Sequence, residues 1–149
     1  MNDARGSIEN LLYRYADLID AGDYDGIGEL CAHGSIADEQ GNAMATGAEA
    51  VAALYGATTR KYPDGTPKSQ HVLTNPIIEF SDDGSRATCR ARFTVLQQTD
   101  ELALQPIIAG DYVDSFENVD GSWRYVEKRM GPRLYGDLSK HLLIDIPTE

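Results

Sequence analysis

The chain has 149 residues, the usual length of a single domain with its own hydrophobic core, and we place that domain at residues 1–149. Its 24 acidic and 13 basic residues give a net charge of −11 at pH 7, and the basic residues form no cluster. This charge repels nucleic acid, so we expect no nucleic-acid partner. It also disfavours a strongly anionic substrate.

Nothing in the sequence resembles a targeting or membrane-spanning segment. Residues 1–20 mix charges with apolar residues and lack the continuous apolar core of a signal peptide, and no later run approaches the length of a membrane span. Cys31 and Cys89 are too few for a disulfide framework or a zinc cluster, so we expect buried thiols in a reducing compartment. We therefore predict a cytoplasmic protein with no membrane partner.

The N-terminal half predicts three helices and a pair of short strands. Ser7 is a good N-cap, apolar residues after it recur at helical spacing, and Gly22 suits the left-handed position that ends a helix. Asp23 can cap a second helix, and Thr46 or Gly47 a third. The expected elements are a helix over residues 7–20, a helix over 24–32, two strands within 35–44 and a helix over 48–59.

The C-terminal half is typical of an antiparallel meander. Gly84 and Gly121 lie in hairpin turns, and apolar and polar residues alternate from Ala87 to Gln98, as in a sheet with one buried face. The expected strands cover residues 72–80, 87–98, 107–117 and 123–130, and an amphipathic C-terminal segment follows. Helices first and strands afterwards indicate an α+β fold.

The stretch Ser69–Phe80 carries the residue with the clearest chemical potential. His71 stands at the start of an apolar strand, and alternation places His71, Leu73 and Asn75 on one face. An imidazole and an amide beside an apolar side chain are typical of a pocket wall. Taken alone, this stretch leaves open the alternative that His71 is exposed or has a structural hydrogen bond.

The element order and several strings resemble the SnoaL-like branch of the nuclear-transport-factor-2-like (NTF2-like) superfamily over nearly the whole chain. The strings are IENLLYRYADLIDAGDYD from residue 8, Gly47 with the helix after it, HVLTNPIIEF from residue 71, GDYVDSFENVDGSWRYVEKR from residue 110, and GDLSKHL from residue 136. The resemblance implies a cone, in which a strongly curved, mostly antiparallel sheet wraps around three N-terminal helices and encloses a ligand cavity. The family includes cyclases, isomerases, dehydratases, a dehydrochlorinase, oxygenase subunits and non-catalytic binders, so the fold alone does not fix the function.

The resemblance also implies a set of catalytic residues. In the dehydratase and dehydrochlorinase members, an Asp at the end of the first helix orients a His on the third strand, and Asp20 and His71 occupy these positions here. Tyr15 matches a Tyr that contributes in the scytalone- and bile-acid-dehydratase-like members. Those dehydratases carry a further acid or His on the next strand, where this chain has Phe93 and Val95. The chain therefore departs from the dehydratase pattern on that strand.

Further residues are candidates for contacting a ligand. Asn75 shares the predicted face of His71, and Tyr112 alternates with Asp114 and Phe116 along one strand. Arg129 is a candidate for holding a polar substituent at the cavity mouth, with a solvated strand end as the alternative reading. The substrate-binding residues that we predict are Asn75, Phe93, Tyr112, Tyr55 and Arg129.

Metal binding is not predicted. The acidic residues Asp20, Asp23 and Asp25 do not form a calcium loop, because Gly22 and Ile27 stand where oxygen ligands are required. No two histidines have the spacing of metal ligands. We expect neither a metal nor a cofactor.

Two functions are compatible with these residues. A His oriented by a carboxylate is a general base, so the first hypothesis is a cofactor-independent, dehydratase-like lyase or isomerase that acts on a hydrophobic cyclic small molecule. The second is non-catalytic, either small-molecule binding or an accessory subunit of a ring-hydroxylating oxygenase. In both cases we expect a homodimer or homotrimer, because the sheet face that carries Arg90 and Arg92 is broad enough to need a partner.

Overall fold

The computed structural model describes residues 3–146, which form three helices and one six-stranded sheet. The elements are α1 (Ala4–Asp20), α2 (Tyr24–Leu30), β1 (Ser35–Asp38), β2 (Ala43–Thr46), α3 (Ala48–Thr58), β3 (Ser69–Phe80), β4 (Arg86–Gln97), β5 (Gln105–Val119) and β6 (Ser122–Tyr135). The strand order is β2-β1-β6-β5-β4-β3, and every neighbouring pair is antiparallel except β1 with β6. This arrangement confirms the predicted α+β class.

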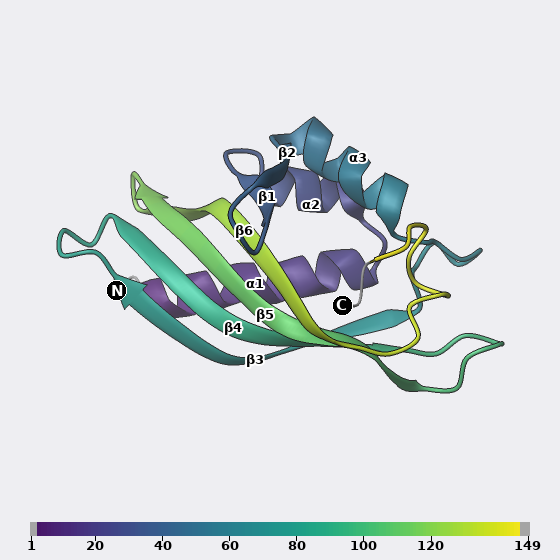
Figure 1. Cartoon of the computed structure of the whole chain (residues 1–149). Helices are drawn as coiled ribbons and strands as arrows, with labels where there is room; N and C mark the ends of the chain where they lie inside the picture. The colour runs from purple at the N-terminus through teal and green to yellow at the C-terminus, as the bar shows by residue number, and fades with distance from the viewer. Residues whose placement is uncertain (1–2, 147–149) are drawn as a thin grey trace.

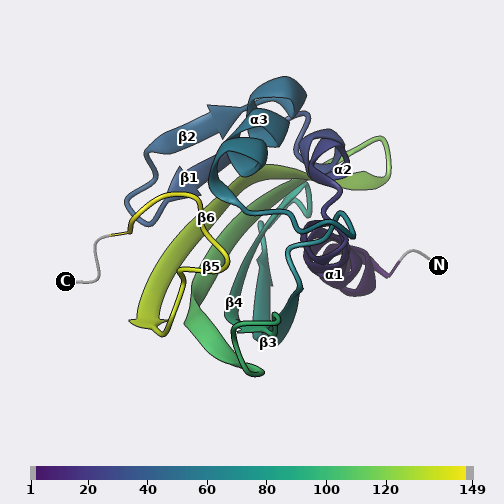
Figure 2. The ribbon, with the colours of Figure 1, turned by 90° about the vertical axis from the view of Figure 1, so that its right-hand side faces the viewer.

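The sheet is strongly curved, and the helices lie on its concave side (Figure 1). In Figure 2, β3 to β6 curve around one side of α1, and α2 and α3 lie above α1. The alternation in β4 produces this packing, because one face of the strand is buried while Arg90 and Arg92 on the other face are exposed. The buried residues of β4 that join the core are Ala87, Cys89, Ala91, Phe93 and Val95.

Several element boundaries differ by a few residues from the prediction, among them the start of α1 and the end of β6. α1 begins at Ala4, one turn before the predicted cap, and the Ser7 amide donates to the Asp3 carbonyl at 2.9 Å as part of the helix. β6 continues past Met130 to Tyr135, because it remains paired with β5 as far as Ile108. The hairpin of β5 and β6 is therefore longer than predicted, and the C-terminal segment follows directly after it.

The predicted alternation of β3 breaks at Asn75. A bulge lies between Thr74 and Ile77, and Asn75 has a φ of 58°. Asn tolerates this left-handed conformation better than most residues, and the following Pro76 has no N–H to donate to the ladder. The bulge turns Asn75 outward, where it is exposed. The predicted face of His71, Leu73 and Asn75 is therefore interrupted after Leu73.

The segment after β6 is fixed to the end of α3. Thr59 and Leu142 form an isolated antiparallel bridge, and the Leu143 amide donates to the Thr58 carbonyl at 2.9 Å. The Arg60 amide donates to the carbonyl of His141 at 2.8 Å. These bonds hold the C-terminal segment against the end of α3. Among the described residues, no helix has the length and apolar character needed to cross a membrane.

Candidate active site

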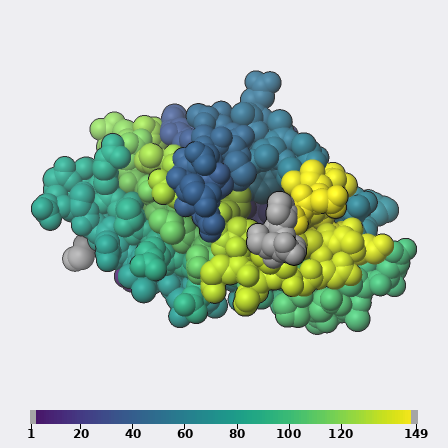
Figure 3. Space-filling view, viewed as in Figure 1, coloured from purple at the N-terminus to yellow at the C-terminus, as the bar shows by residue number. Residues whose placement is uncertain are grey.

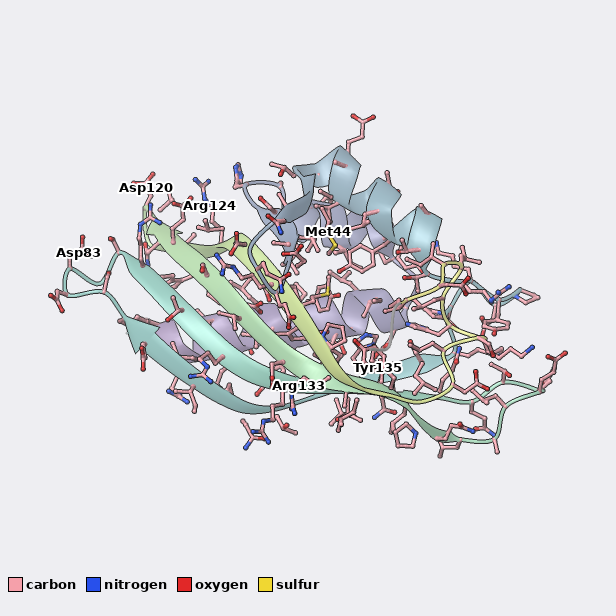
Figure 4. The ribbon with its side chains drawn as sticks, viewed as in Figure 1. Met44, Asp83, Asp120, Arg124, Arg133 and Tyr135 are labelled. Atoms are coloured by element: carbon pink, nitrogen blue, oxygen red, sulfur yellow. The ribbon has the colours of Figure 1, made fainter. Side chains whose placement is uncertain are left out.

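A cavity of about 350 Å³ lies between the helices, the concave face of the sheet and the C-terminal segment. Figure 3 shows a hollow between the blue surface of β1, β2 and α3 and the yellow surface of the C-terminal segment. Met44 of β2 lines the cavity, and Figure 4 shows it among the elements that enclose this space. The volume is within the range of small-molecule sites, roughly 300–1,000 Å³. The lining residues that carry polar or aromatic groups include Tyr15, Tyr55, His71, Phe93, Tyr112 and His141.

Asp20 and His71 form a hydrogen-bonded pair at this cavity. One carboxylate oxygen of Asp20 is 2.7 Å from His71 Nδ1, and the other accepts the backbone N–H of His71 at 2.7 Å. Ser69 Oγ donates to the same carboxylate at 2.9 Å. Because Nδ1 faces an acceptor, the neutral ring carries its proton there, and Nε2 is left with a lone pair.

A close approach between loops brings this pair together. α1 ends at Asp20, and Gly22 follows with a φ of 72°. A Cβ atom at Gly22 would lie 2.0 Å from the Gly65 carbonyl oxygen, so only glycine fits between the end of α1 and the loop that leads into β3. The end of α1 is thereby held against the start of β3, where His71 lies.

Tyr15 faces the same cavity from α1 and is bonded to Tyr55 of α3. The two phenol oxygens are 2.6 Å apart, and the Tyr15 ring lies edge-on to His71 with a centroid distance of 6.4 Å. Burial, followed by the charge of the neighbouring tyrosine, raises the pKa of Tyr15 well above its usual value, and burial likewise raises the pKa of Tyr55. Both phenols stay protonated, so one donates to the other. The Met130 sulfur, 4.0 Å from the Tyr15 oxygen, is a weak acceptor for the second O–H, and a ligand oxygen can replace it.

A buried ion pair supports the aromatic wall of the cavity. Tyr112 stacks on Phe93 with a centroid distance of 4.5 Å. The Lys128 ammonium is 3.5 Å from the Tyr112 ring centroid and 4.3 Å from that of Tyr15. Its Nζ donates to Asp114 Oδ2 at 2.9 Å, and both charged side chains are 0% exposed. The lysine of this ion pair therefore contacts two tyrosines that line the cavity and holds their rings in place.

The structure brings together the three predicted catalytic residues and three of the predicted ligand contacts, Tyr55, Phe93 and Tyr112. It places the other two elsewhere. Asn75 lies outside the cavity because of the β3 bulge. Arg129 forms an ion pair with Glu127 and packs against Gly41, because its neighbour Lys128 takes the inward-facing position of β6.

His141 is a second histidine of the cavity, and the sequence alone did not indicate its role. Its ring is 5% exposed, and its centroid is 6.3 Å from that of His71. Burial lowers the pKa of His141 to about 4, and the nearby His71 contributes in the same direction. The ring is therefore neutral at pH 7. Only the string GDLSKHL pointed to this segment, and it gave no indication of where the imidazole lies.

We expect the free energy of unfolding to decrease as the pH falls from about 6.5 to about 4, by at most about 3 kcal/mol from His141. In this window the unfolded chain binds a proton at His141 and the folded chain does not, so acid favours unfolding. Urea titrations at several pH values should show a weaker pH dependence for His141→Gln. His33→Gln, at an exposed histidine, is the control and should match the wild type. Equal pH dependence in all three proteins would contradict the expectation.

The fold and its cavity define an NTF2-like cone, and the sequence places the chain within that class. Residues 2–129 match the family model of the SnoaL-like domain, and the chain belongs to this family. In the described part of the chain, no group of three or more His, Cys, Asp and Glu side chains is placed to hold a metal ion.

Several solved structures share the fold. An NTF2-like protein with a cystatin-like fold from Novosphingobium aromaticivorans is 24% identical, with a TM-score of 0.69 over 85% of this chain and 80% of that one. A proposed scytalone dehydratase from the same organism is 20% identical, with a TM-score of 0.68 over 89% and 86%. LinA is 18% identical, with a TM-score of 0.70 over 97% and 93%. A search against curated proteins found no match. At these identities the similarities establish the fold.

Proposed function

We propose that this protein is a cofactor-independent lyase or isomerase that removes a proton from a carbon atom of a hydrophobic cyclic small molecule. The observation that supports this proposal is the Asp20–His71 hydrogen bond of 2.7 Å at the wall of an apolar cavity. Membership of the SnoaL-like family and the similarity in fold to a proposed scytalone dehydratase are consistent with this class of reaction.

In this mechanism His71 Nε2 accepts the proton, and Asp20 holds the ring in the required tautomer. The carboxylate also stabilises the imidazolium that forms. The electron pair left on carbon enters a new double bond. In a lyase, the leaving group on the next carbon departs and takes its proton from His71. In an isomerase, His71 returns the proton to a different carbon. The O–H retained by the Tyr15–Tyr55 pair donates to an oxygen that gains negative charge.

The residues that line the cavity support a flat, apolar ligand. The stacked pair of Phe93 and Tyr112 provides an aromatic wall, and Met44 and Leu54 line the cavity as well. The net charge of −11 disfavours anionic compounds. A fused ring system with one or two oxygen substituents fits these conditions.

We expect a panel of steroids, aromatic polyketides and terpenoid ketones and epoxides to contain a ligand that raises the melting temperature of wild type and of His71→Ala. Chromatography should then show that only the wild type consumes it. His33→Ala, which removes an exposed histidine, is the matched control and should retain turnover. Consumption by His71→Ala at the wild-type rate would assign the chemistry to another group.

The alternative function is non-catalytic binding, or a role as an accessory subunit of an oxygenase. Two observations favour it: the Tyr15 hydroxyl is already bonded to Tyr55, and β4 presents Phe93 and Val95 where related dehydratases carry a further acid or His. Binding without conversion throughout the panel would support this alternative. A homodimer or homotrimer remains a proposal under both functions, supported by exposed Ile77 and Val113 on the outer face of the sheet.

A further inference from the structure

The C-terminal segment brings a second imidazole to the cavity at a fixed position. The carbonyl of His141 accepts the Arg60 amide at 2.8 Å, and its own amide donates to the Leu138 carbonyl at 3.1 Å. With a centroid distance of 6.3 Å, both rings can reach a C–H group and an oxygen atom two bonds away, each at about 3 Å. His71 of β3 and His141 of the C-terminal segment therefore line the cavity as a pair.

The protonation of His141 follows from its surroundings. Nδ1 is buried and has no hydrogen-bond partner among residues 3–146. After burial, the charges of His71 and Asp20 act on the pKa of His141, and Asp20 is already bonded to His71. A proton on Nδ1 would be a buried N–H without an acceptor, an arrangement that is rare in folded proteins. The proton of the neutral ring therefore resides on Nε2, whose available partner is a molecule in the cavity.

The two rings consequently have opposite hydrogen-bonding roles. His71 Nε2 is an acceptor, because Nδ1–H is directed at Asp20. His141 Nε2–H is a donor. Within the cavity, Thr58 Oγ1 already donates to the Leu54 carbonyl. One O–H of the Tyr15–Tyr55 pair is used in the bond between the two phenols, and the Met130 sulfur lies 4.0 Å from the Tyr15 oxygen as an acceptor for the other. His141 is thus a donor placed near the base without a competing protein partner.

We propose that His141 donates a hydrogen bond to a ketone oxygen of the substrate while His71 removes the proton from the carbon next to that ketone. This inference rests on the proposed function and narrows the substrate class to cyclic ketones with an acidic C–H beside the carbonyl. The proton passes from carbon to His71 Nε2, and the electron pair of the C–H bond forms the C=C bond of an enolate. The N–H of His141 stabilises the enolate oxygen without transferring its proton, because a neutral imidazole is too weak an acid to do so.

The binding test uses 2-naphthol, which presents an oxygen on an aromatic ring, and 2-methylnaphthalene, which has a methyl group in its place. We expect His141→Leu to bind 2-naphthol about tenfold more weakly than wild type, the usual effect of losing one hydrogen bond, and to bind 2-methylnaphthalene unchanged. His141→Gln keeps an N–H donor and should retain most of the preference for 2-naphthol. An unchanged ratio of the two dissociation constants in His141→Leu would overturn the proposal.

A second measurement needs no variant at the ring. Nitrogen-15 chemical shifts of His141 in the wild-type protein at pH 7 should show a neutral ring protonated at Nε2. A neutral ring protonated at Nδ1, or a charged ring, would also overturn the proposal. This experiment decides the question even if His141→Leu does not fold.

Kinetics separate this inference from the proposed function. On a ketone that the wild type converts, His141→Leu should lower kcat by about 10- to 100-fold with a smaller change in KM, because the hydrogen bond strengthens as the oxygen gains charge. Conversion that is insensitive to His141→Leu would leave the proposed function intact and refute this inference. If no ketone is converted but the preference for 2-naphthol depends on His141, the proposed function fails and His141 stands as a ligand-binding donor.

Discussion

Replacement of Asp20 with Asn is expected to lower kcat by about 10²–10⁴-fold on any compound that the wild type converts. In wild type, Asp20 accepts hydrogen bonds from His71 Nδ1, the His71 amide and Ser69 Oγ. An Asn at this position keeps one oxygen for the His71 amide, and its NH₂ group then faces Nδ1. The ring is forced to accept at Nδ1 and to carry its proton on Nε2, where the base is required. We therefore expect the fold to survive and the base to be lost.

Ser69→Ala is the matched control for this experiment. It removes one hydrogen bond from the same carboxylate but leaves the tautomer of His71 unchanged, so kcat should stay within a few-fold of wild type. Steady-state kinetics and melting temperatures of both variants are the measurements. Equal losses in the two variants would mean that the precise position of the carboxylate matters and the tautomer does not. Full activity of Asp20→Asn would remove Asp20 from the mechanism.

The pair of Asp20 and His71 was predictable because strong local signals fix both residues. Gly22 sets the end of α1, the apolar run after His71 defines β3, and the resemblance to known dehydratases joins the two positions. Asn75 was misplaced because alternation assumes an unbroken strand. The bulge before Ile77 depends on how β3 meets β4, a tertiary property that the β3 sequence does not encode by itself.

Lys128 and His141 show a different limit of sequence reasoning. Either Lys128 or Arg129 could face inward on β6, and hydrophobicity does not distinguish two cations. The choice depends on Asp114 of β5, which is paired with Lys128 across the sheet and offers a buried partner. His141 lies in a segment without regular secondary structure, so no periodicity indicates its direction. Its place in the cavity follows from main-chain bonds to the end of α3.

Lys128→Met is expected to reduce the free energy of unfolding by about 3–5 kcal/mol at pH 7. Met has a similar volume but leaves the Asp114 carboxylate buried without its cation, and that side chain is 0% exposed. Burial already raises the pKa of Asp114 despite Lys128, so the variant should keep this carboxyl protonated over a wider pH range. A protonated Asp114 carries no buried charge. The destabilisation should therefore diminish as the pH is lowered toward the ordinary pKa of an aspartic acid.

Urea unfolding of Lys128→Met, of the double variant Lys128→Met/Asp114→Leu and of Lys68→Met tests this account. The double variant removes both charges and should recover much of the lost stability, because an apolar pair needs no compensation. Lys68→Met breaks an exposed ion pair with Asp64 and should have little effect. If the double variant were as unstable as the single one, packing of the lysine stem would explain the loss. Recovery of stability without wild-type binding of 2-methylnaphthalene would instead show that the ammonium holds Tyr15 and Tyr112 in place. The distances of 4.3 and 3.5 Å from the ammonium to their ring centroids indicate this role.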